Sequence, residues 1–209
     1  MSDKKRGGRP KKFDRTEALV AALHVFWSKG YDGASLKDLT TAMGINGPSL
    51  YAEFGDKLAL YRCAIQHYAE DHGCAPLTAF EREADIQKAV RAFMVAAIEH
   101  ATAAESGARG CFLSSCVATS AGALEGVDIL LQAAITDTDK RIAHRFDAER
   151  AAGNLPDAFP SLERARLLLD LRQGHMFRAR AGFEPQELSD DLEYRARMVL
   201  HCDETTRST

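Results

Sequence analysis

The sequence predicts an all-α protein of about nine helices in two unequal parts. Apolar residues recur at helical spacing along most of the chain, and no stretch shows the period-2 alternation of a convincing β-strand. Breaks that contain Gly or Pro separate the helical stretches, and the break HGCAPLT at residues 72–78 divides the two parts best. We therefore expect a flexible basic arm at residues 1–12, a first unit at residues 13–72 and a larger helical unit at residues 78–209.

Capping signals place the first two helices. Asp14 is a suitable N-cap for a helix of apolar residues at helical spacing, and Gly30 ends that pattern. Ser35, followed three residues later by Asp38, is a second N-terminal signal. The helix that follows ends at Gly44 after about two turns.

The third and fourth helices follow a tight corner. A helix begins near Asn46 or Gly47, and a proline is tolerated in its first turn. Leu50 and Phe54 are four residues apart, so they form one buried side of this helix. Asp56 then caps a fourth helix. The first unit thus contains two very short helices joined by a corner of about three residues.

The second unit consists of longer helical patterns. Apolar stripes predict helices at residues 90–101, at about 111–119, from 127 to near 153, at 162–181 and at 186–202. The leucines of the helix at 162–181 cover more than one side, which indicates burial on two sides. Either a partner subunit covers the second side, or these leucines are part of the core of a monomer.

Charge is distributed unevenly along the chain. The net charge is −3, but residues 1–62 carry 11 basic and 7 acidic side chains, and the remainder carries 16 and 23. A basic end on an acidic body suggests that one end meets a polyanion. The alternative is a solvated tail that aids solubility.

Composition also limits location and cysteine chemistry. No apolar run approaches the ~20 residues of a membrane helix, and the polar N-terminus shows no secretory signal, so we expect a cytoplasmic protein with no membrane contact. Five cysteines at irregular spacing do not indicate a disulfide framework. No His-x-x-His or Cys-x-x-Cys pair, phosphate loop, nucleophile elbow or paired-acid motif occurs. We expect no metal, no cofactor and no enzyme activity.

The corner Gly44-Ile45-Asn46 is typical of a helix-turn-helix, in which two short helices meet across a turn that contains glycine. Such a turn holds the second helix at a wide angle, so that this helix can enter a DNA major groove about 12 Å wide. Ser49 and Tyr51 would then face outward, and the start of the helix would offer unpaired N–H groups to phosphate. The alternative is an α-hairpin that packs only on itself.

Residues 16–61 carry a longer set of features in fixed order and spacing. These features are Phe26, Gly30-Tyr31, Ser35, Ala42-Met43-Gly44-Ile45, Ser49-Leu50-Tyr51, Phe54 and Lys57. The segment resembles the N-terminal domain of the TetR/AcrR family of transcriptional regulators, and the GCFLSS and RARAGF stretches resemble one large branch of that family. The resemblance implies a homodimer that binds a palindromic operator in double-stranded DNA and usually represses. It also implies that an unidentified small-molecule effector in the second unit releases the protein, and that the helices at 162–181 and 186–202 pair with their mates.

The resemblance assigns a set of DNA contacts to residues of this chain. They are Ser35, Asn46, Gly47, Pro48, Ser49, Tyr51 and Lys57, and to these we add Lys37 and the arm residues Arg6 and Arg9. Two residues depart from the family pattern: Glu53 replaces a neutral, aromatic or basic residue, and a glycine stands at position 47, where a longer side chain could read a base. Base readout by this helix therefore depends on Ser49 and Tyr51. The arm arginines, Arg6 and Arg9, add contacts in a narrow A·T minor groove.

An effector site is expected among the helices of the second unit. The candidate ligand-binding residues are Phe93, Met94, Cys111, Phe112, His144, His175 and Met176. An aromatic and methionine stripe can equally be plain core, and each histidine alone can be a surface or hydrogen-bonded residue. We expect these side chains either to line a cavity or to fill the interior.

Cys111 supports an alternative function. It follows a loop glycine at a helix start, where the helix dipole and the nearby Arg109 favour the thiolate. Cys116 lies five residues on, a poor spacing for one helix face, so we expect no disulfide between the two. Three functions stay open: a ligand-released DNA-binding repressor, an oxidant or electrophile sensor that acts through Cys111, and a helical scaffold that no longer binds DNA. In the second case Cys111 is reactive, and otherwise it is a small buried filler.

Overall fold

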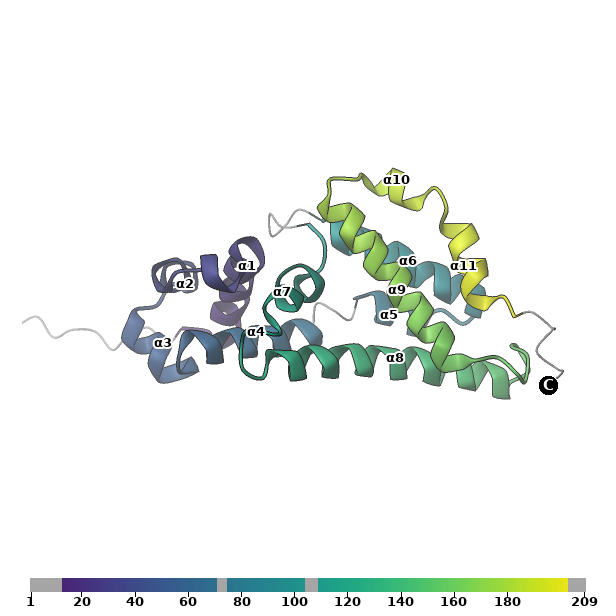
Figure 1. The fold of residues 1–209 in the computed structure, drawn as a ribbon, viewed down its shortest axis with the longest axis horizontal. Helices are drawn as coiled ribbons and strands as arrows, with labels where there is room; N and C mark the ends of the chain where they lie inside the picture. Colours follow the sequence, from purple (N-terminus) through teal and green to yellow (C-terminus); the bar gives the residue numbers. More distant parts are fainter. Residues whose placement is uncertain (1–12, 71–74, 104–108, 203–209) are drawn as a thin grey trace, which may run out of the picture.

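The computed structural model describes residues 13–70, 75–103 and 109–202, and every regular element in these ranges is helical (Figure 1). Nine of the described α-helices have eight residues or more, as the sequence predicts. The molecule is elongated, with the first four helices at one end and the remaining helices at the other. Arg6 and Arg9 lie outside the described residues.

The head of the molecule comprises the first four helices. They are α1 (Arg15–Gly33), α2 (Leu36–Met43), α3 (Gly47–Phe54) and α4 (Lys57–Glu70). The α1 helix packs on α2 and α4, and α3 packs on α2 and α4. The short helices α2 and α3 therefore rest on a base formed by the two longer ones.

The capping residues behave as the sequence predicts. The Asp14 side chain accepts hydrogen bonds from two backbone N–H groups of the first turn of α1, and Ser35 forms a reciprocal capping box with Asp38. Gly44 ends α2 with φ +64°, a left-handed conformation that glycine adopts without steric cost. Gly30 has φ +70° and ψ 175°, which interrupts the last turns of α1 where the sequence predicts the end of that helix.

The body consists of the remaining elements. They are α5 (Ala75–Arg82), α6 (Ile86–Thr102), the π-helix η3 (Leu113–Val117), α7 (Ala118–Ser120), α8 (Val127–Ala151), α9 (Ser161–Arg180), α10 (Pro185–Ser189) and α11 (Leu192–Leu200). The α9 helix packs against α6, α8 and α11, and α5 packs on α6. The long helix α8 runs beneath the body and reaches α4 of the head (Figure 1).

Two parts of the body differ from the sequence-based expectation. The expected single helix at 186–202 is two helices, with the break at Asp190 and Asp191. Short polar side chains such as Ser and Asp compete with the helix by bonding nearby backbone, and the Ser189 hydroxyl donates to the carbonyl of Pro185 at 2.7 Å. The sequence analysis predicts no helix in the second unit before residue 90, whereas α5 covers Ala75–Arg82, with Pro76 in its first turn.

A set of aromatic rings joins the head to the body. The ring of Phe112 lies 6.2 Å from that of Trp27 in α1, and 5.9 Å and 5.5 Å from those of Tyr61 and Tyr68 in α4. Phe112 is fully buried in this contact. None of the helices in the described ranges is long and apolar enough to cross a membrane.

Candidate nucleic-acid interface and effector cavity

The corner between α2 and α3 is fixed by backbone bonds and a small apolar core. The N–H groups of Gly44 and Ile45 donate to carbonyls in the last turn of α2. Leu50 and Phe54 of α3 are buried, as the sequence predicts, and they pack into the same core as Leu39 and Met43 of α2. These contacts hold the opposite side of α3 outward.

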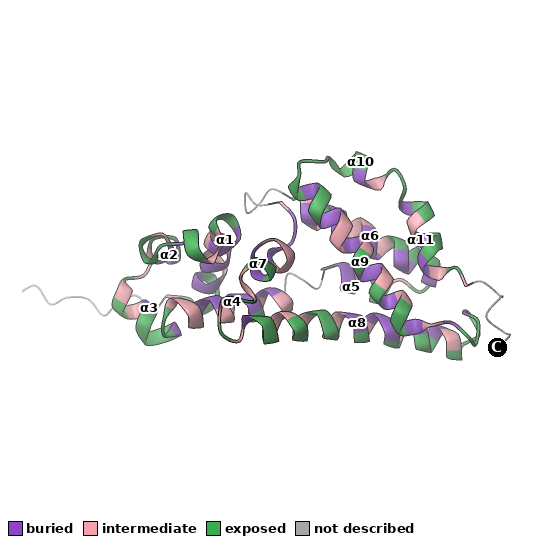
Figure 2. Cartoon of the chain, in the orientation of Figure 1, coloured by how far each residue is buried: buried purple, intermediate pink, exposed green. Residues whose placement is uncertain are grey.

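The outer side of α3 is open to solvent (Figure 2). The Tyr51 side chain is 53% exposed, Pro48 and Ala52 are exposed, and Ser49 is half-buried. The side chain of Asn46 accepts a hydrogen bond from the Ser49 N–H at 2.8 Å, so its oxygen serves as the helix cap. Neither Ser49 nor Tyr51 is sealed inside the molecule, which the alternative of a self-packing hairpin would require.

The other predicted contact residues surround this surface. Ser35 and Lys37 are exposed at the start of α2, and the Ser35 hydroxyl is engaged with Asp38 in the capping box. The Lys57 ammonium lies 4.4 Å from the centre of the Tyr31 ring at the start of α4. A hydrogen bond from Lys29, with those from Ser35, lowers the pKa of Asp38 far below its ordinary value, so this carboxylate stays ionised beside the head surface.

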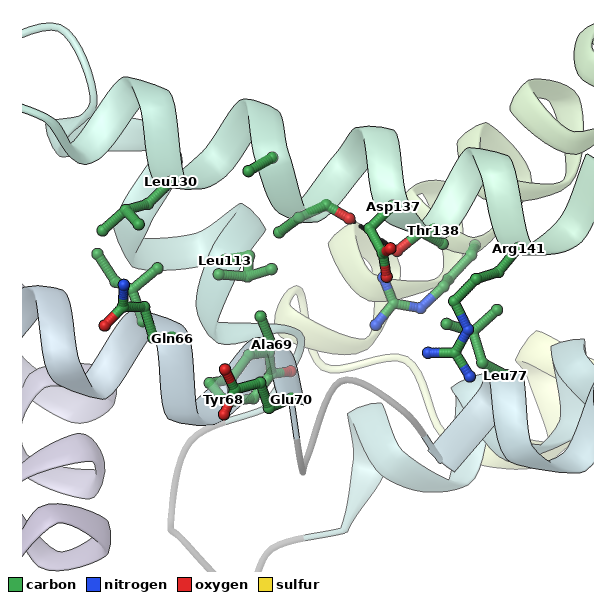
Figure 3. Close-up of a pocket in the computed structure, with 14 residues that line it drawn as sticks. Gln66, Tyr68, Ala69, Glu70, Leu77, Leu113, Leu130, Asp137, Thr138 and Arg141 are labelled. Atoms are coloured by element: carbon green, nitrogen blue, oxygen red, sulfur yellow. Dashed lines mark hydrogen bonds between the residues drawn. The ribbon is translucent and has the colours of Figure 1, made fainter.

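A cavity of about 500 Å³ lies between α4, α5 and α8 (Figure 3). Leu113, Leu130 and Leu77 give it apolar walls, and the polar side chains labelled in Figure 3 come from α4 and α8. The polar lining residues are Gln66, Tyr68, Glu70, Asp137, Thr138, Arg141 and Arg172. This volume lies in the range of sites for small organic molecules, which run from ~300 to ~1,000 Å³.

None of the seven predicted ligand residues lines this cavity. Phe93, Met94, Phe112 and Met176 are core residues, because their rings and side chains fill the contacts between helices. His144 is exposed on α8, on a side that faces solvent. In this structure the aromatic and methionine stripe belongs to the core, and a role of its residues in ligand binding stays a prediction.

His175 is buried beside a second, smaller cavity of about 130 Å³ between α9, α10 and α11. Within the described part of the chain, neither ring nitrogen has a hydrogen-bond partner. Burial and the cation of Arg195 lower the pKa of His175 to about 4, so its ring is neutral near pH 7. Among the described residues, no three His, Cys, Asp or Glu side chains are grouped as a metal ion would require.

Cys111 lies directly behind the wall of the larger cavity. The Tyr68 hydroxyl donates to its sulfur at 3.3 Å, and the Arg172 guanidinium lies 3.9 Å away. Burial raises the pKa of the Cys111 thiol, but Arg172, Tyr68 and nearby backbone N–H groups outweigh this effect, and the net pKa is lowered. The sequence suggested Arg109 as the activating cation. That suggestion is wrong, because Arg109 pairs with Glu184 at 3.0 Å.

Three polar contacts connect the head to the segment that follows Cys111. The thiol of Cys116 donates to the Trp27 carbonyl at 3.3 Å, and the hydroxyls of Tyr61 and Ser120 lie 3.2 Å apart. Arg62 donates through Nε to the Glu125 carbonyl at 2.9 Å, and also through Nη2. The same short segment therefore contacts the cavity at Leu113 and the helices of the head.

A helix-turn-helix head with an exposed second helix, on a helical body with a ligand-sized cavity, defines a DNA-binding regulator. Comparison with known proteins agrees. The family model of bacterial regulatory proteins of the tetR family matches residues 18–63. The chain is 29% identical over 186 residues to the HTH-type transcriptional repressor ComR of Escherichia coli (strain K12). The aligned region covers 88% of this chain and 88% of ComR. The chain is also 43% identical over 61 residues to the repressor BdcR of the same organism, 29% of this chain and 31% of BdcR.

Solved structures extend the similarity to the whole fold. The TetR family regulator CifR, determined as a cysteine mutant complexed with a 26 bp double-strand operator DNA, has a TM-score of 0.80 and 30% identity. The match covers 90% of this chain and 98% of that one. The chain belongs to the TetR family of DNA-binding transcriptional regulators. It is therefore a regulator and not an enzyme, as the sequence predicts.

The sequence did not identify the cavity residues. They come from α4, α5, α8, α9 and η3, and most are polar or small side chains with no shared motif. One signal was present: Gln66, Ala69 and Glu70 interrupt the apolar pattern of α4 on one side. That pattern is equally typical of an ordinary solvated helix face.

Proposed function

We propose that this regulator is a homodimeric repressor that binds a palindromic operator through α2 and α3. The observation that carries the proposal is the outer side of α3, held outward by the buried Leu50 and Phe54 with Tyr51 exposed beside it. The similarity to ComR, a repressor, and to CifR, which has been seen on operator DNA, supports it. Residues 13–72 form the DNA-binding unit in this proposal, and residues 78–209 form the unit for effector binding and dimerisation.

In the proposed complex, α3 enters the major groove. Ser49 and Tyr51 contact base edges or a thymine methyl, and the N–H groups at the start of α3 meet a phosphate. Lys37 and Lys57 bind phosphates beside the groove, and Lys57 is presented for this role by its contact with Tyr31. Phosphate contacts set the register of the protein on DNA, and the few base contacts set the sequence it selects.

Variants of Tyr51 test the proposal. A duplex selected by the full-length protein from a random-sequence library serves as the probe. Tyr51→Ala should weaken binding about tenfold or more and leave thermal unfolding unchanged, because the side chain is exposed. Ile129→Ala is the matched control, since Ile129 is 67% exposed on α8, a helix of the body and not of the helix-turn-helix. Equal affinities for wild type and Tyr51→Ala would contradict the proposal.

The dimer would form through α9 and α11. Phe177 is 78% exposed on α9, and Tyr194 and Met198 are 61% and 40% exposed on α11. Gly174 lies one turn before Phe177, and among the described residues no heavy atom lies within 4 Å of a side-chain carbon added there. An apolar surface with a glycine in a helix interior suits close approach of a second helix. A two-fold dimer would set the two α3 helices about 34 Å apart, one turn of DNA.

Light scattering tests the dimer. Phe177→Glu and Gly174→Leu should both shift the protein from dimer to monomer at micromolar concentration. Ile129→Glu places the same charge on another exposed apolar residue, so it should leave the dimer intact. A monomeric wild type, or a dimer that tolerates both changes, would rule out this interface.

The effector would occupy the cavity between α4, α5 and α8. A molecule there presses on Leu113 and on Tyr68, and the contacts Cys116–Trp27, Tyr61–Ser120 and Arg62–Glu125 transmit the change to the head. A differential affinity of ~1–3 kcal/mol between the two states changes operator affinity by 5- to 150-fold. Arg62→Ala should therefore reduce the response to an effector more than it reduces operator binding itself. Full retention of the response would refute this route.

A second candidate function is favoured by the surroundings of Cys111. A thiol with a lowered pKa, held between Tyr68 and Arg172 behind the cavity wall, is suited to react with an oxidant or electrophile that enters the cavity. Cys111→Ser should abolish the release from DNA that hydrogen peroxide or an alkylating agent causes. Cys202→Ser is the control, since Cys202 is a free cysteine outside the cavity lining and outside the contacts with the head, and it should leave the release intact. Normal release of the Cys111→Ser protein would end this candidate.

A further inference from the structure

We propose that Arg15 is a phosphate-binding residue at the edge of the DNA-facing surface, and that Glu53 and Phe54 of α3 hold it in position. The ligand is a backbone phosphate of duplex DNA. This inference rests on the proposed binding mode of α3, and it gives a role to the acidic residue that departs from the family pattern.

The geometry fixes one half of the guanidinium and leaves the other half open. Arg15 is the first residue of α1, and its Nε donates to Glu53 Oε1 at 2.8 Å. Its Cζ lies 4.9 Å from the centre of the Phe54 ring, which orients the plane of the group. Within the described ranges, the two terminal Nη nitrogens have no hydrogen-bond partner. A planar edge with two N–H donors is the arrangement that binds a phosphate in bidentate fashion.

The location matches this chemistry. Glu53 lies four residues after Ser49, one helical turn further along the same side of α3. Leu50 and Phe54 are buried, so this side borders the exposed face and would run along one wall of the major groove. Tyr51 lies toward the opposite border. The terminal N–H groups of the Arg15 guanidinium therefore lie where α3, bound in the groove, would pass a sugar-phosphate strand.

A purely structural role for the pair explains little. The Arg15 and Glu53 side chains are 54% and 39% exposed, and solvent and salt screen such pairs strongly. An unpaired carboxylate at position 53 would repel the phosphates of DNA. The ion pair with Arg15 therefore matters more in the DNA complex than in the free protein. Glu53 is a positioning residue in this account, because it acts on the phosphate through Arg15.

The salt dependence of DNA binding tests the inference. The dissociation constant is measured over a range of KCl concentrations with the library-selected duplex. Arg15→Met should lower the magnitude of the slope of log K against log salt by ~0.9 for each protomer, the value for one phosphate contact. Arg91→Met is the matched control, since Arg91 is also 54% exposed and its Nε binds a glutamate, Glu193, at 2.6 Å in the body. The control should leave the slope unchanged.

A double-variant cycle separates phosphate binding from simple neutralisation of Glu53. Glu53→Gln removes the charge but keeps an oxygen that accepts from Arg15 Nε, so binding should be as tight as wild type or tighter. Arg15→Met should reduce the slope equally in the wild-type and the Glu53→Gln backgrounds. If Arg15→Met has no effect once Glu53 is neutral, Arg15 only compensates Glu53 and the inference is wrong.

The outcomes distinguish this inference from the proposed function. If DNA binding depends on Tyr51 but wild type and Arg15→Met have the same salt slope, the role of Arg15 is overturned and the proposed function of α3 stands. Binding that does not depend on Tyr51 overturns the binding mode itself. Thermal unfolding of each variant within a few degrees of wild type shows that the head is folded in every arm of the experiment.

Discussion

Replacing Arg172 should raise the pKa of the Cys111 thiol strongly, because that cation is the main group opposing burial. The Arg172 Nη2 and the Cys111 sulfur are 3.9 Å apart. At an effective dielectric constant of about 20, two unit charges at this distance attract by about 4 kcal/mol, so Arg172 strongly favours the thiolate form of Cys111. Arg172→Met removes this attraction and leaves the sulfur buried, so the pKa should move above its ordinary value of 9.0.

The assay follows the modification of each cysteine by iodoacetamide as a function of pH, with the modified peptides quantified by mass spectrometry. The midpoint of the pH profile reports the pKa, whereas the plateau rate also reports access through the cavity. In wild type, Cys111 should have a midpoint below 9 and Cys116 one above it, because burial raises the pKa of Cys116. Arg172→Met should raise the Cys111 midpoint and leave that of Cys116 almost unchanged.

Arg172→Lys is the control that keeps the charge, and it should preserve most of the lowering of the Cys111 pKa. The reasoning is refuted if Arg172→Met leaves the Cys111 midpoint where it was. It is also refuted if the two cysteines of the wild-type protein titrate together, since their surroundings should move their pKa values in opposite directions.

Three further predictions concern the arm, the glycine corners and a buried histidine. Deletion of residues 1–12 should weaken operator binding and lower its salt slope by ~0.9 for each phosphate released; an unchanged slope in a filter-binding titration would argue against the arm. Gly30→Ala should cost ~1–3 kcal/mol of unfolding free energy in urea, because φ +70° with ψ 175° is a region that only glycine occupies readily. Gly44→Asn, at φ +64°, should cost less than about 1 kcal/mol, since asparagine tolerates the left-handed region; equal losses at both sites would contradict the assigned backbone. The pKa of His175 is about 4 when folded and 6.5 ordinarily, so the unfolded chain binds more protons between these values and stability should fall as pH drops from 6.5 toward 4. His175→Gln should flatten that dependence in urea titrations at pH 5 and pH 7, and a pH dependence as steep as in wild type would show that His175 is not its source.

Local signals made the head predictable. Asp14, Ser35 and Gly44 each act through hydrogen bonds or backbone angles within a few residues, so their effect is visible in a short stretch of sequence. The pair Leu50 and Phe54 fixes the outward side of α3 by spacing alone. The caps depend only on neighbouring residues, and the partners of Leu50 and Phe54 in α2 are themselves close in the sequence.

The body depended on contacts that sequence spacing does not encode. Phe112 belongs to a residue type that is common in ligand pockets, yet its ring packs against those of Trp27, Tyr61 and Tyr68 from the head. The activating cation of Cys111 comes from residue 172, 61 positions away, and not from the neighbouring Arg109. The surroundings of Phe112 and of Cys111 are both set by burial, and burial depends on the packing of helices that are distant in the sequence.

The wide turn η3 at Leu113–Val117 sets the rotational phase of the short helix α7 that continues it. Each residue of an α-helix advances by about 100° around the axis, so a tightening of this turn by one residue would rotate the following side chains by about that angle. Ser120 would then swing away from Tyr61, and the thiol of Cys116 would leave the Trp27 carbonyl. In the proposed function, a change in the cavity beside Leu113 that tightened this turn would therefore break two of the contacts on which the head rests.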